Sequence, residues 1–213
     1  MDTQVKMKPK IEVIKEPIAH LLVPGEMGVV LELTVKDKDG KVTDHRVMRS
    51  KSLVKQFLQL LWVEMYGLPA TAPLSIRDTG NTLQNVYQYI LNFWSAGGIG
   101  DVTFGTIVGT GVTAPTIDDY KIETIIDHGV AAGQLQYGAV TFGAPSSDAT
   151  TSQFTVTRNF ANGSGGAITV NEIALYVTGK AGKYMTIHDV IGGGVAVPDG
   201  QTLTVNYRPQ VVV

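Results

Sequence analysis

Apolar and polar side chains alternate along much of this chain, a pattern typical of strands with one buried face. The clearest case is Val29–Val35, which reads V-V-L-E-L-T-V, and Val42–Met48 is expected to be its return strand. The intervening Asp37–Lys41 contains an Asp-Gly step, which readily adopts the positive φ angles that hairpin turns need. The pattern therefore predicts an early β-hairpin, preceded by a short strand at Ile11–Ile14.

A different period follows this hairpin, because apolar residues recur at helical spacing up to Tyr66. One stripe contains Leu53, Phe57, Leu60 and Leu61, and a second contains Val54, Leu58, Trp62 and Met65. We expect Ser50 or Ser52 to cap this helix and Gly67 to end it.

Two apolar stripes need more than one surface to bury them. The helix is therefore expected in a groove between the N-terminal hairpin and the main β domain. In the alternative, the stripe with Leu58 and Trp62 packs on a neighbouring subunit, which makes these two residues interface candidates.

Beyond a linker at Leu68–Pro73, nearly every signal is for strands. The expected strands are Leu83–Trp94, Thr103–Val108, Leu135–Phe142, Gln153–Phe160, Ala167–Val177, Tyr184–Val190 and Leu203–Val213, although the first would also suit a helix. Turn residues at Asn162–Gly166 predict that the two strands on either side form a hairpin. We expect Gly192–Gly194 to be flexible and Pro209 to lie at a sheet edge or a bulge.

Many short strands at regular spacing predict a mainly β protein (α+β overall). The expected fold is an antiparallel β-sandwich or jelly-roll-like domain over residues 71–213, preceded by a small hairpin-plus-helix module over residues 1–70. No coiled-coil heptads occur, so a long fibre shaft is not expected.

Composition narrows the classes of function. The chain has 17 basic and 19 acidic residues, a net charge of −2. It therefore lacks the excess of positive charge that is typical of nucleic-acid-binding proteins. It contains no cysteine, and we expect neither a signal peptide nor a membrane anchor. Only 17% of residues are charged, against about 25% in typical domains. This low charge suits either a well-buried sandwich or a surface that meets other subunits.

The segment Ile107–Tyr120 begins like a dinucleotide-binding loop, with Gly109 and Gly111 after a predicted strand. Such a loop must open a helix, whose N-terminus holds the pyrophosphate. Here Pro115 follows, and the residue before a proline is pushed out of the α region. Two aspartates then place negative charge where a phosphate would sit, so the sequence argues against a nucleotide site.

Three segments resemble virion structural proteins of tailed phages: V-G-T-G, T-A-P-T and D-D-Y within Ile107–Tyr120, T-V-N-E-I-A-L-Y at Thr169–Tyr176, and V-P-D-G-Q-T-L-T-V-N-Y at Val197–Tyr207. The resemblance covers about Asp78 to Val213. It implies a β-rich structural protein of the virion that packs against other virion subunits and copies of itself. Capsid decoration, a neck or collar, and a tail or baseplate accessory all fit.

Residues suited to catalysis are scarce. None of His20, His45, His128 and His188 has a second histidine at metal-ligand spacing. The His188-Asp189 neighbours would point to opposite faces of a strand, which makes them poor partners for a proton relay. No Gly-x-Ser-x-Gly elbow is present. We therefore expect no catalytic residue, no cofactor and no enzymatic activity.

The densest acidic cluster is Asp118, Asp119, Glu123 and Asp127. A solvated or capping role is the simplest interpretation, with Asp118 and Asp119 as weak calcium candidates. A polysaccharide hydrolase that uses paired carboxylates is the weakest alternative. A receptor- or glycan-binding module at a tail tip is the stronger alternative. It would use exposed aromatics such as Trp94, which is also an interface candidate.

Overall fold

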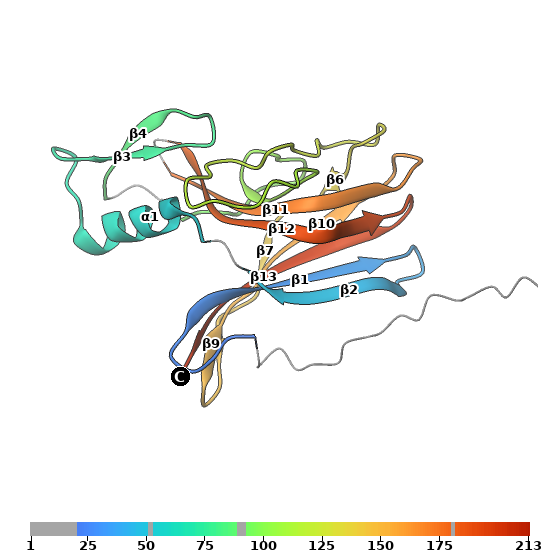
Figure 1. Cartoon of the computed structure of the whole chain (residues 1–213), viewed down its shortest axis with the longest axis horizontal. Helices are drawn as coiled ribbons and strands as arrows, with labels where there is room; N and C mark the ends of the chain where they lie inside the picture. The colour runs from blue at the N-terminus through green and yellow to red at the C-terminus, as the bar shows by residue number, and fades with distance from the viewer. Residues whose placement is uncertain (1–20, 51–52, 89–92, 180–181) are drawn as a thin grey trace, which may run out of the picture.

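The computed structural model describes residues 21–50, 53–88, 93–179 and 182–213, and it confirms a mainly β fold with antiparallel sheets (Figure 1). The elements are β1 (Met27–Lys36), β2 (Val42–Arg49), α1 (Lys55–Tyr66), β3 (Leu74–Arg77), β4 (Leu83–Val86), β5 (Gly105–Gly109), β6 (Gln136–Tyr137), β7 (Thr141–Phe142), β8 (Ser146–Ser147), β9 (Thr151–Gln153), β10 (Val156–Ala161), β11 (Ile168–Thr178), β12 (Lys183–Val197) and β13 (Thr202–Val212). The strand expected at Ile11–Ile14 lies outside the described residues.

The larger sheet has the order β2-β1-β13-β10-β6, with β7 added to β10 and the β8–β9 pair added to β13. The predicted hairpin is confirmed as β1 and β2. Its turn is held by the Asp37 carboxylate, which accepts hydrogen bonds from the backbone N–H groups of Asp39 and Lys41 at 3.0 and 2.9 Å. The sheet does not break near residue 70, because β1 pairs with β13 from Met27↔Val211 to Lys36↔Thr202.

The smaller sheet has the order β12-β11-β5 and lies over the larger one (Figure 1). The inner faces of the two sheets form one core. Members of this core include Leu31, Leu33, Leu203, Val205 and Tyr207 from the larger sheet, and Ile107, Ile173 and Ile187 from the smaller. The alternation seen in the sequence thus places one face of each layer in the interior.

The hairpin predicted around Asn162–Gly166 is wrong. β10 pairs with β13 in the larger sheet, whereas β11 pairs with β12 and β5 in the smaller one. The segment between them is a crossover from one layer to the other. The Asn162 amide holds this crossover, because it donates to the carbonyls of Gly166 at 2.8 Å and Val197 at 2.6 Å.

Helix α1 ends as expected, with Gly67 in the left-handed conformation at φ 66°. Its expected cap is wrong for Ser50, whose hydroxyl donates to the Asp189 carboxylate at 2.7 Å; Ser52 lies outside the described residues. The expected position of the helix is also wrong. Its buried residues Leu60 and Val63 belong to a second core with β3, β4 and the adjoining ends of β11 and β12, beside the sandwich (Figure 1).

Two strands are shorter than the sequence predicted. The expected strand Leu83–Trp94 stops at Val86 as β4, and residues 89–92 of it lie outside the described residues. The expected strand Leu135–Phe142 divides into β6 and β7. The backbone N–H of Gly138 donates to the carbonyl of Asn159 in β10, whereas that of Val140 donates to the carbonyl of Gly97, which lies in a loop. The segment therefore does not pair continuously with one strand.

The expectation for Pro209 also needs correction, and Gly192–Gly194, expected to be flexible, lie within a strand. All three glycines lie inside β12, where the ladder with β11 shifts register between Val170 and Glu172. Pro209 lies in β13, an inner strand, opposite the junction between β9 and β10. The ladder is interrupted at that junction, so the missing N–H of the proline costs no hydrogen bond.

A fully buried arginine ties the loops to the larger sheet. Val156 and Arg158 lie on the buried face of β10. The guanidinium of Arg158 donates to the carbonyls of Gly138, Phe104, Thr106, Gly98 and Asp101. It also lies 4.8 Å from the ring centre of Tyr137. One side chain from the sheet therefore holds the whole segment that leads into β5.

Candidate functional site

A polar cluster lies where the glycine-rich segment crosses the smaller sheet. Glu172 is on β11, His188 is on the neighbouring β12, and Asp119 comes from the loop after β5. The ladder places Glu172 opposite Val190 and Ala174 opposite His188, so Glu172 and His188 are diagonal neighbours on one face. Both are buried, whereas Asp119 reaches them from the surface.

Both nitrogens of the His188 ring meet a carboxylate. Nδ1 lies 2.7 Å from Asp119 Oδ2, and Nε2 lies 2.8 Å from Glu172 Oε1. A ring that donates from both nitrogens carries a positive charge. Burial opposes that charge, but the bonds to Glu172 and Asp119 outweigh it and raise the pKa of His188 above its ordinary value. The cluster is therefore an imidazolium held between two carboxylates.

The two carboxylates of the cluster also bond to the loop, mainly to its backbone. Glu172 Oε1 accepts the N–H of Glu123 at 2.7 Å, and Asp119 accepts the N–H of Thr116 at 2.8 Å. Burial raises the pKa of Asp119, but the bonds from Thr116 and His188 outweigh this and lower it overall. Because His188 has no free basic nitrogen, the cluster suits loop fixation better than proton transfer.

The two glycines of the V-G-T-G motif leave space for Glu172. A Cβ on Gly109 would contact the backbone oxygen of Thr124 and lie 2.9 Å from Glu172 Oε2. A Cβ on Gly111 would contact the same carboxylate and the Glu123 side chain. The motif thus serves a buried carboxylate of the protein itself, which agrees with the sequence argument against a phosphate loop.

A hollow of about 230 Å³ lies beside the cluster, lined by Thr113, Ala114, Asp119, Lys121, Glu123, Glu172 and His188. Among the residues that the structure describes, no group of three or more His, Asp or Glu side chains is arranged to hold a metal ion. The calcium candidates are engaged elsewhere: Asp118 pairs with Lys55 at 2.5 Å, and Asp119 binds His188. Of the expected acidic cluster, Asp119 and Glu123 line this one hollow, whereas Asp118 pairs with Lys55.

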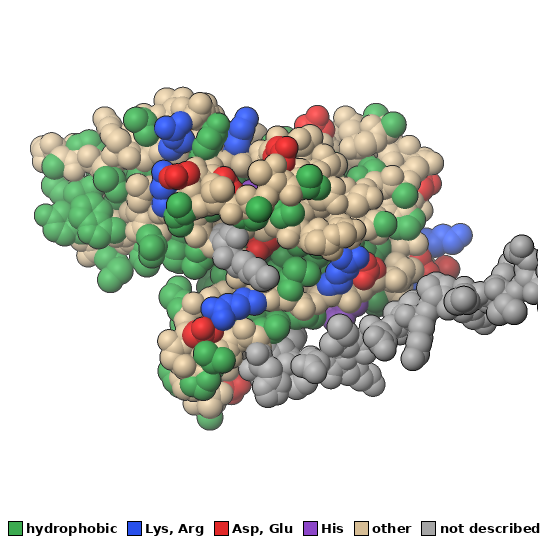
Figure 2. Space-filling view, viewed as in Figure 1, with side chains coloured by type: hydrophobic (Ala, Val, Ile, Leu, Met, Phe, Trp, Pro, Cys, Tyr) green, Lys and Arg blue, Asp and Glu red, His purple; other side chains and the backbone are tan. Residues whose placement is uncertain are grey.

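Except for Val54, which is buried in the core of the sandwich, the second apolar stripe of α1 faces solvent. Leu58 is 63% exposed, Trp62 48%, Met65 80% and Tyr66 63%. The rings of Trp62 and Tyr66 stack at 5.1 Å between centres. Figure 2 shows hydrophobic atoms gathered at the end of the molecule formed by α1. We call these four residues the α1 face; two of them, Leu58 and Trp62, are the interface candidates from the sequence.

Trp94 is also exposed, at 51%, and its ring lies 5.4 Å from that of Phe104. The Lys183 ammonium lies 5.6 Å from the centre of the Phe104 ring and bonds to the Thr103 hydroxyl. An aromatic pair with a polar rim is thus present where the sequence indicated only one exposed tryptophan. Phe93, the residue before Trp94, is 39% exposed.

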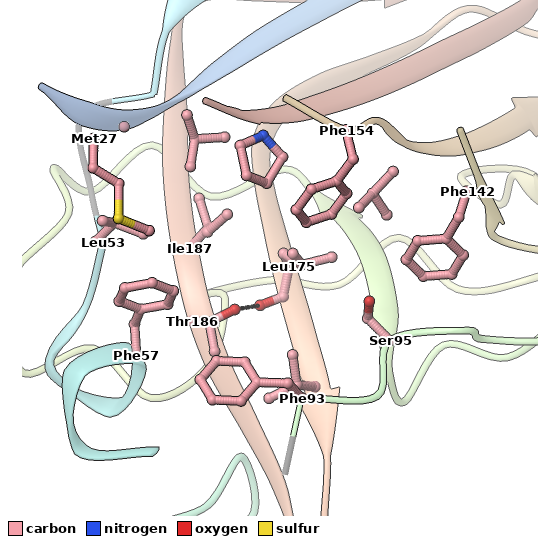
Figure 3. Close-up of a pocket in the computed structure, with 15 residues that line it drawn as sticks. Met27, Leu53, Phe57, Phe93, Ser95, Phe142, Phe154, Leu175, Thr186 and Ile187 are labelled. Atoms are coloured by element: carbon pink, nitrogen blue, oxygen red, sulfur yellow. Dashed lines mark hydrogen bonds between the residues drawn. The ribbon is translucent and has the colours of Figure 1, made fainter. Parts of the chain in front are cut away.

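An apolar groove opens between the two sheets near the start of α1 (Figure 3). Met27 and Leu53 lie at one side, Phe142 and Phe154 at the other, and Leu175 and Ile187 between them. Phe57 and Phe93 meet edge-on at 6.0 Å along its rim. The sequence did not indicate this groove, because its walls come from strands and loops that are distant in the chain.

Glu172 and His188 were also missed as functional residues in the sequence. One signal was available, because each is an ionisable residue at an inward position of a strongly apolar strand. Such positions need a partner when buried.

Comparisons with protein-family models, curated proteins and solved structures each returned no match. No helix in the described part of the chain is long and apolar enough to span a membrane.

Proposed function

We propose that this protein is a structural subunit that assembles with copies of itself and with other subunits, as part of a tailed-phage virion. The observation that carries the proposal is the α1 face, with four large apolar side chains exposed on one helix. Clustered exposed apolar residues are typical of protein interaction sites. Tryptophan and tyrosine are among the residues that contribute most to binding at interfaces.

The stacked Trp62 and Tyr66 pair strengthens this proposal. Stacking orders both rings before any partner binds, which reduces the entropy lost on association. The opposite side of α1 is packed on β3, β4 and the smaller sheet. This packing fixes the orientation of the helix, so the α1 face is already positioned for a partner. The particle itself is proposed from the resemblance of Ile107–Tyr120 and Thr169–Tyr176 to virion proteins.

Sedimentation velocity of the full chain over a range of concentrations tests self-assembly. We expect the native chain to form oligomers, and Leu58→Asp or Trp62→Asp to yield folded monomers with an unchanged circular dichroism spectrum. Val42→Asp is a matched control, because Val42 is 45% exposed but lies on β2, far from the helix. A native chain that stays monomeric at every concentration would refute self-assembly.

A position in the particle has its own test. In a cryo-electron microscopy reconstruction of a tailed-phage particle that contains this chain, we expect the α1 face to be covered by a neighbouring subunit. Density that shows α1 in solvent at every copy would contradict the interface.

Glycan binding at a tail tip is a second candidate, favoured by Trp94 beside Phe104 and the polar groups of Lys183 and Thr103. Exposed aromatic faces next to hydrogen-bonding groups suit sugar rings. A glycan array with the native chain and with Trp94→Ala tests it. Signals that disappear only in the variant would support a glycan site, and an array without signals would remove this candidate.

A further inference from the structure

The larger sheet has an open edge at β2 (Figure 1). Within the described residues, β2 pairs with β1 on one side, and no strand pairs with its other side. None of the eight residues of β2 is buried. An open strand presents unpaired N–H and C=O groups, to which a strand of another chain can bond. The edge of β2 is therefore a surface on which a further strand can be added.

The hydrogen bonds with β1 show which residues of β2 have free backbone groups. The Ser50 N–H donates to the Val29 carbonyl at 2.8 Å, so Ser50 faces β1. From there the ladder runs without a shift as far as Asp44. Residues that face the paired strand alternate with residues that face away from it. Val47 and His45 therefore turn their N–H and C=O groups to the open side.

Two charges of opposite sign flank His45 on this edge. Asp44 and Arg46 lie opposite Val35 and Leu33 of β1, so both project from the same face of the sheet. Their side chains are 32% and 33% exposed and lie 3.0 Å apart. Both charges are therefore accessible to a neighbouring strand.

A second copy of β2 is the partner that these charges fit. When two β2 strands run antiparallel with His45 opposite His45, Asp44 of each copy lies opposite Arg46 of the other. Opposite charges at facing positions stabilise a strand pair. A shift of one copy by two residues places aspartate opposite aspartate or arginine opposite arginine, which is unfavourable. A shift by one residue sets free backbone groups against groups already bonded to β1.

We propose that two copies of this chain join edge to edge through β2, over Thr43–Val47 and around a two-fold axis at His45. The two larger sheets then form one continuous sheet. The backbone N–H and C=O groups of the two His45 residues bond to each other, and Asp44 and Arg46 occupy the adjacent positions, where facing side chains are closest. Glu32, 2.9 Å from the His45 ring, gives each imidazole a carboxylate beside the axis.

This contact is separate from the α1 face, but it rests on the proposed self-assembly for its strength. Two five-residue edges bury little area beside the about 1,200–2,000 Å² of stable interfaces. Copies held together by the α1 face have a high effective concentration for one another, which favours a second, weak contact. Two different self-contacts on one chain link more than two copies, as an extended assembly requires.

Disulfide trapping tests both the contact and its register, because the native chain has no cysteine. In the full-length variant His45→Cys, the two thiols belong to facing residues of a hydrogen-bonded pair, with Cα atoms about 5.5 Å apart. This separation suits a disulfide. In the control Val47→Cys, the two thiols lie four residues apart along the strands, about 13 Å. We expect His45→Cys to form disulfide-linked dimers at least ten times faster, and equal rates would overturn the proposal.

Charge exchange tests the pairing of Asp44 with Arg46. Asp44→Arg in the His45→Cys chain places arginine opposite arginine, and we expect it to slow dimer formation about tenfold. Asp44→Arg/Arg46→Asp restores opposite charges at the same positions, and we expect it to restore the rate. Circular dichroism of each variant checks that the chain is folded. A folded Asp44→Arg variant that cross-links as fast as before would contradict the register.

Failure of this contact and failure of self-assembly through the α1 face give different results. If the native chain sediments as a monomer but His45→Cys still cross-links ten times faster than Val47→Cys, the β2 contact stands and the α1 contact falls. If oligomers form but the two variants cross-link equally, the β2 contact falls and the α1 contact stands. With Leu58→Asp added to both variants, we expect slower cross-linking and the same preference for His45→Cys.

Discussion

Gly109 on β5 lies directly opposite Glu172 on β11, and the Glu172 carboxylate lies against the space that a Cβ of Gly109 would need. Glu172 is 1% exposed. The glycine thus allows a buried charge to lie against the backbone of the neighbouring strand. This relationship gives the V-G-T-G motif a structural meaning, because its small residues accommodate an internal ion cluster.

Gly109→Ala is therefore expected to destabilise the fold. Its Cβ would press on the Thr124 carbonyl oxygen, a backbone atom that cannot rotate away. Overpacking of this kind costs about 1–3 kcal/mol. Urea unfolding measures the loss, with Gly166→Ala as the control, because a Cβ there meets nothing within 4 Å. Equal midpoints for the two variants would contradict the steric argument.

The His188 cluster predicts how stability depends on pH. The pKa of His188 is raised in the folded protein, so its contribution is complete below the unfolded value of about 6.5. The contribution is lost as pH rises through the folded pKa. We expect His188→Gln to cost about 3–5 kcal/mol near pH 6, because Glu172 is left buried without its partner.

The difference between the native chain and His188→Gln should shrink steadily above pH 6.5. Thermal unfolding from pH 5 to pH 10 measures it. His45 pairs with Glu32 and is present in both proteins, so the difference isolates His188. A difference that stays constant across this range would show that His188 is not held as an imidazolium.

Arg158→Lys should be strongly destabilising, although the charge is kept. A lysine ammonium cannot reach the five carbonyls that the guanidinium bonds. We expect a loss of about 3–5 kcal/mol, and faster amide hydrogen exchange in residues 97–106. Arg46→Lys, at a more exposed pair with Asp44, should change stability by less than about 0.5 kcal/mol. Similar effects at the two sites would argue against the role of Arg158.

Gln56→Met is expected to stabilise the protein. Gln56 is fully buried on α1, and within the described structure neither amide atom of its side chain has a hydrogen-bond partner. An unpaired buried polar group costs about 1–3 kcal/mol, which an apolar side chain of similar shape avoids. Differential scanning calorimetry should show a higher Tm. Gln84→Met should lower it, because the Gln84 amide donates to Asp78 at 2.8 Å.

Local patterns predicted the β1–β2 hairpin, the α1 helix and its end at Gly67, since each is encoded within a few neighbouring residues. They failed at the crossover after β10. Asn162–Gly166 has the composition of a hairpin turn, and only pairing with the distant β13 reveals that β10 belongs to another sheet. Alternation identifies a strand and its buried face, but the choice of partner is non-local.

The candidate sites show the same limit. The exposure of Leu58 and Trp62 could be anticipated, because α1 has more apolar surface than one contact can cover. The partnership of Asp119 with His188 spans 69 positions, and no local window contains both residues. The groove likewise joins Met27, Phe142 and Ile187 from separate parts of the chain.

The pairing of β1 with β13 has a mechanical consequence. Met27, at the start of β1, lies beside Val211 near the end of β13, and the two strands run antiparallel from that point. A force that pulls these two ends apart would act on one hydrogen-bonded pair at a time. Pulling Met27 and Val211 apart would therefore unzip β1 from β13 at low force. A force that slides the two strands past each other would instead be shared by all the hydrogen bonds between them.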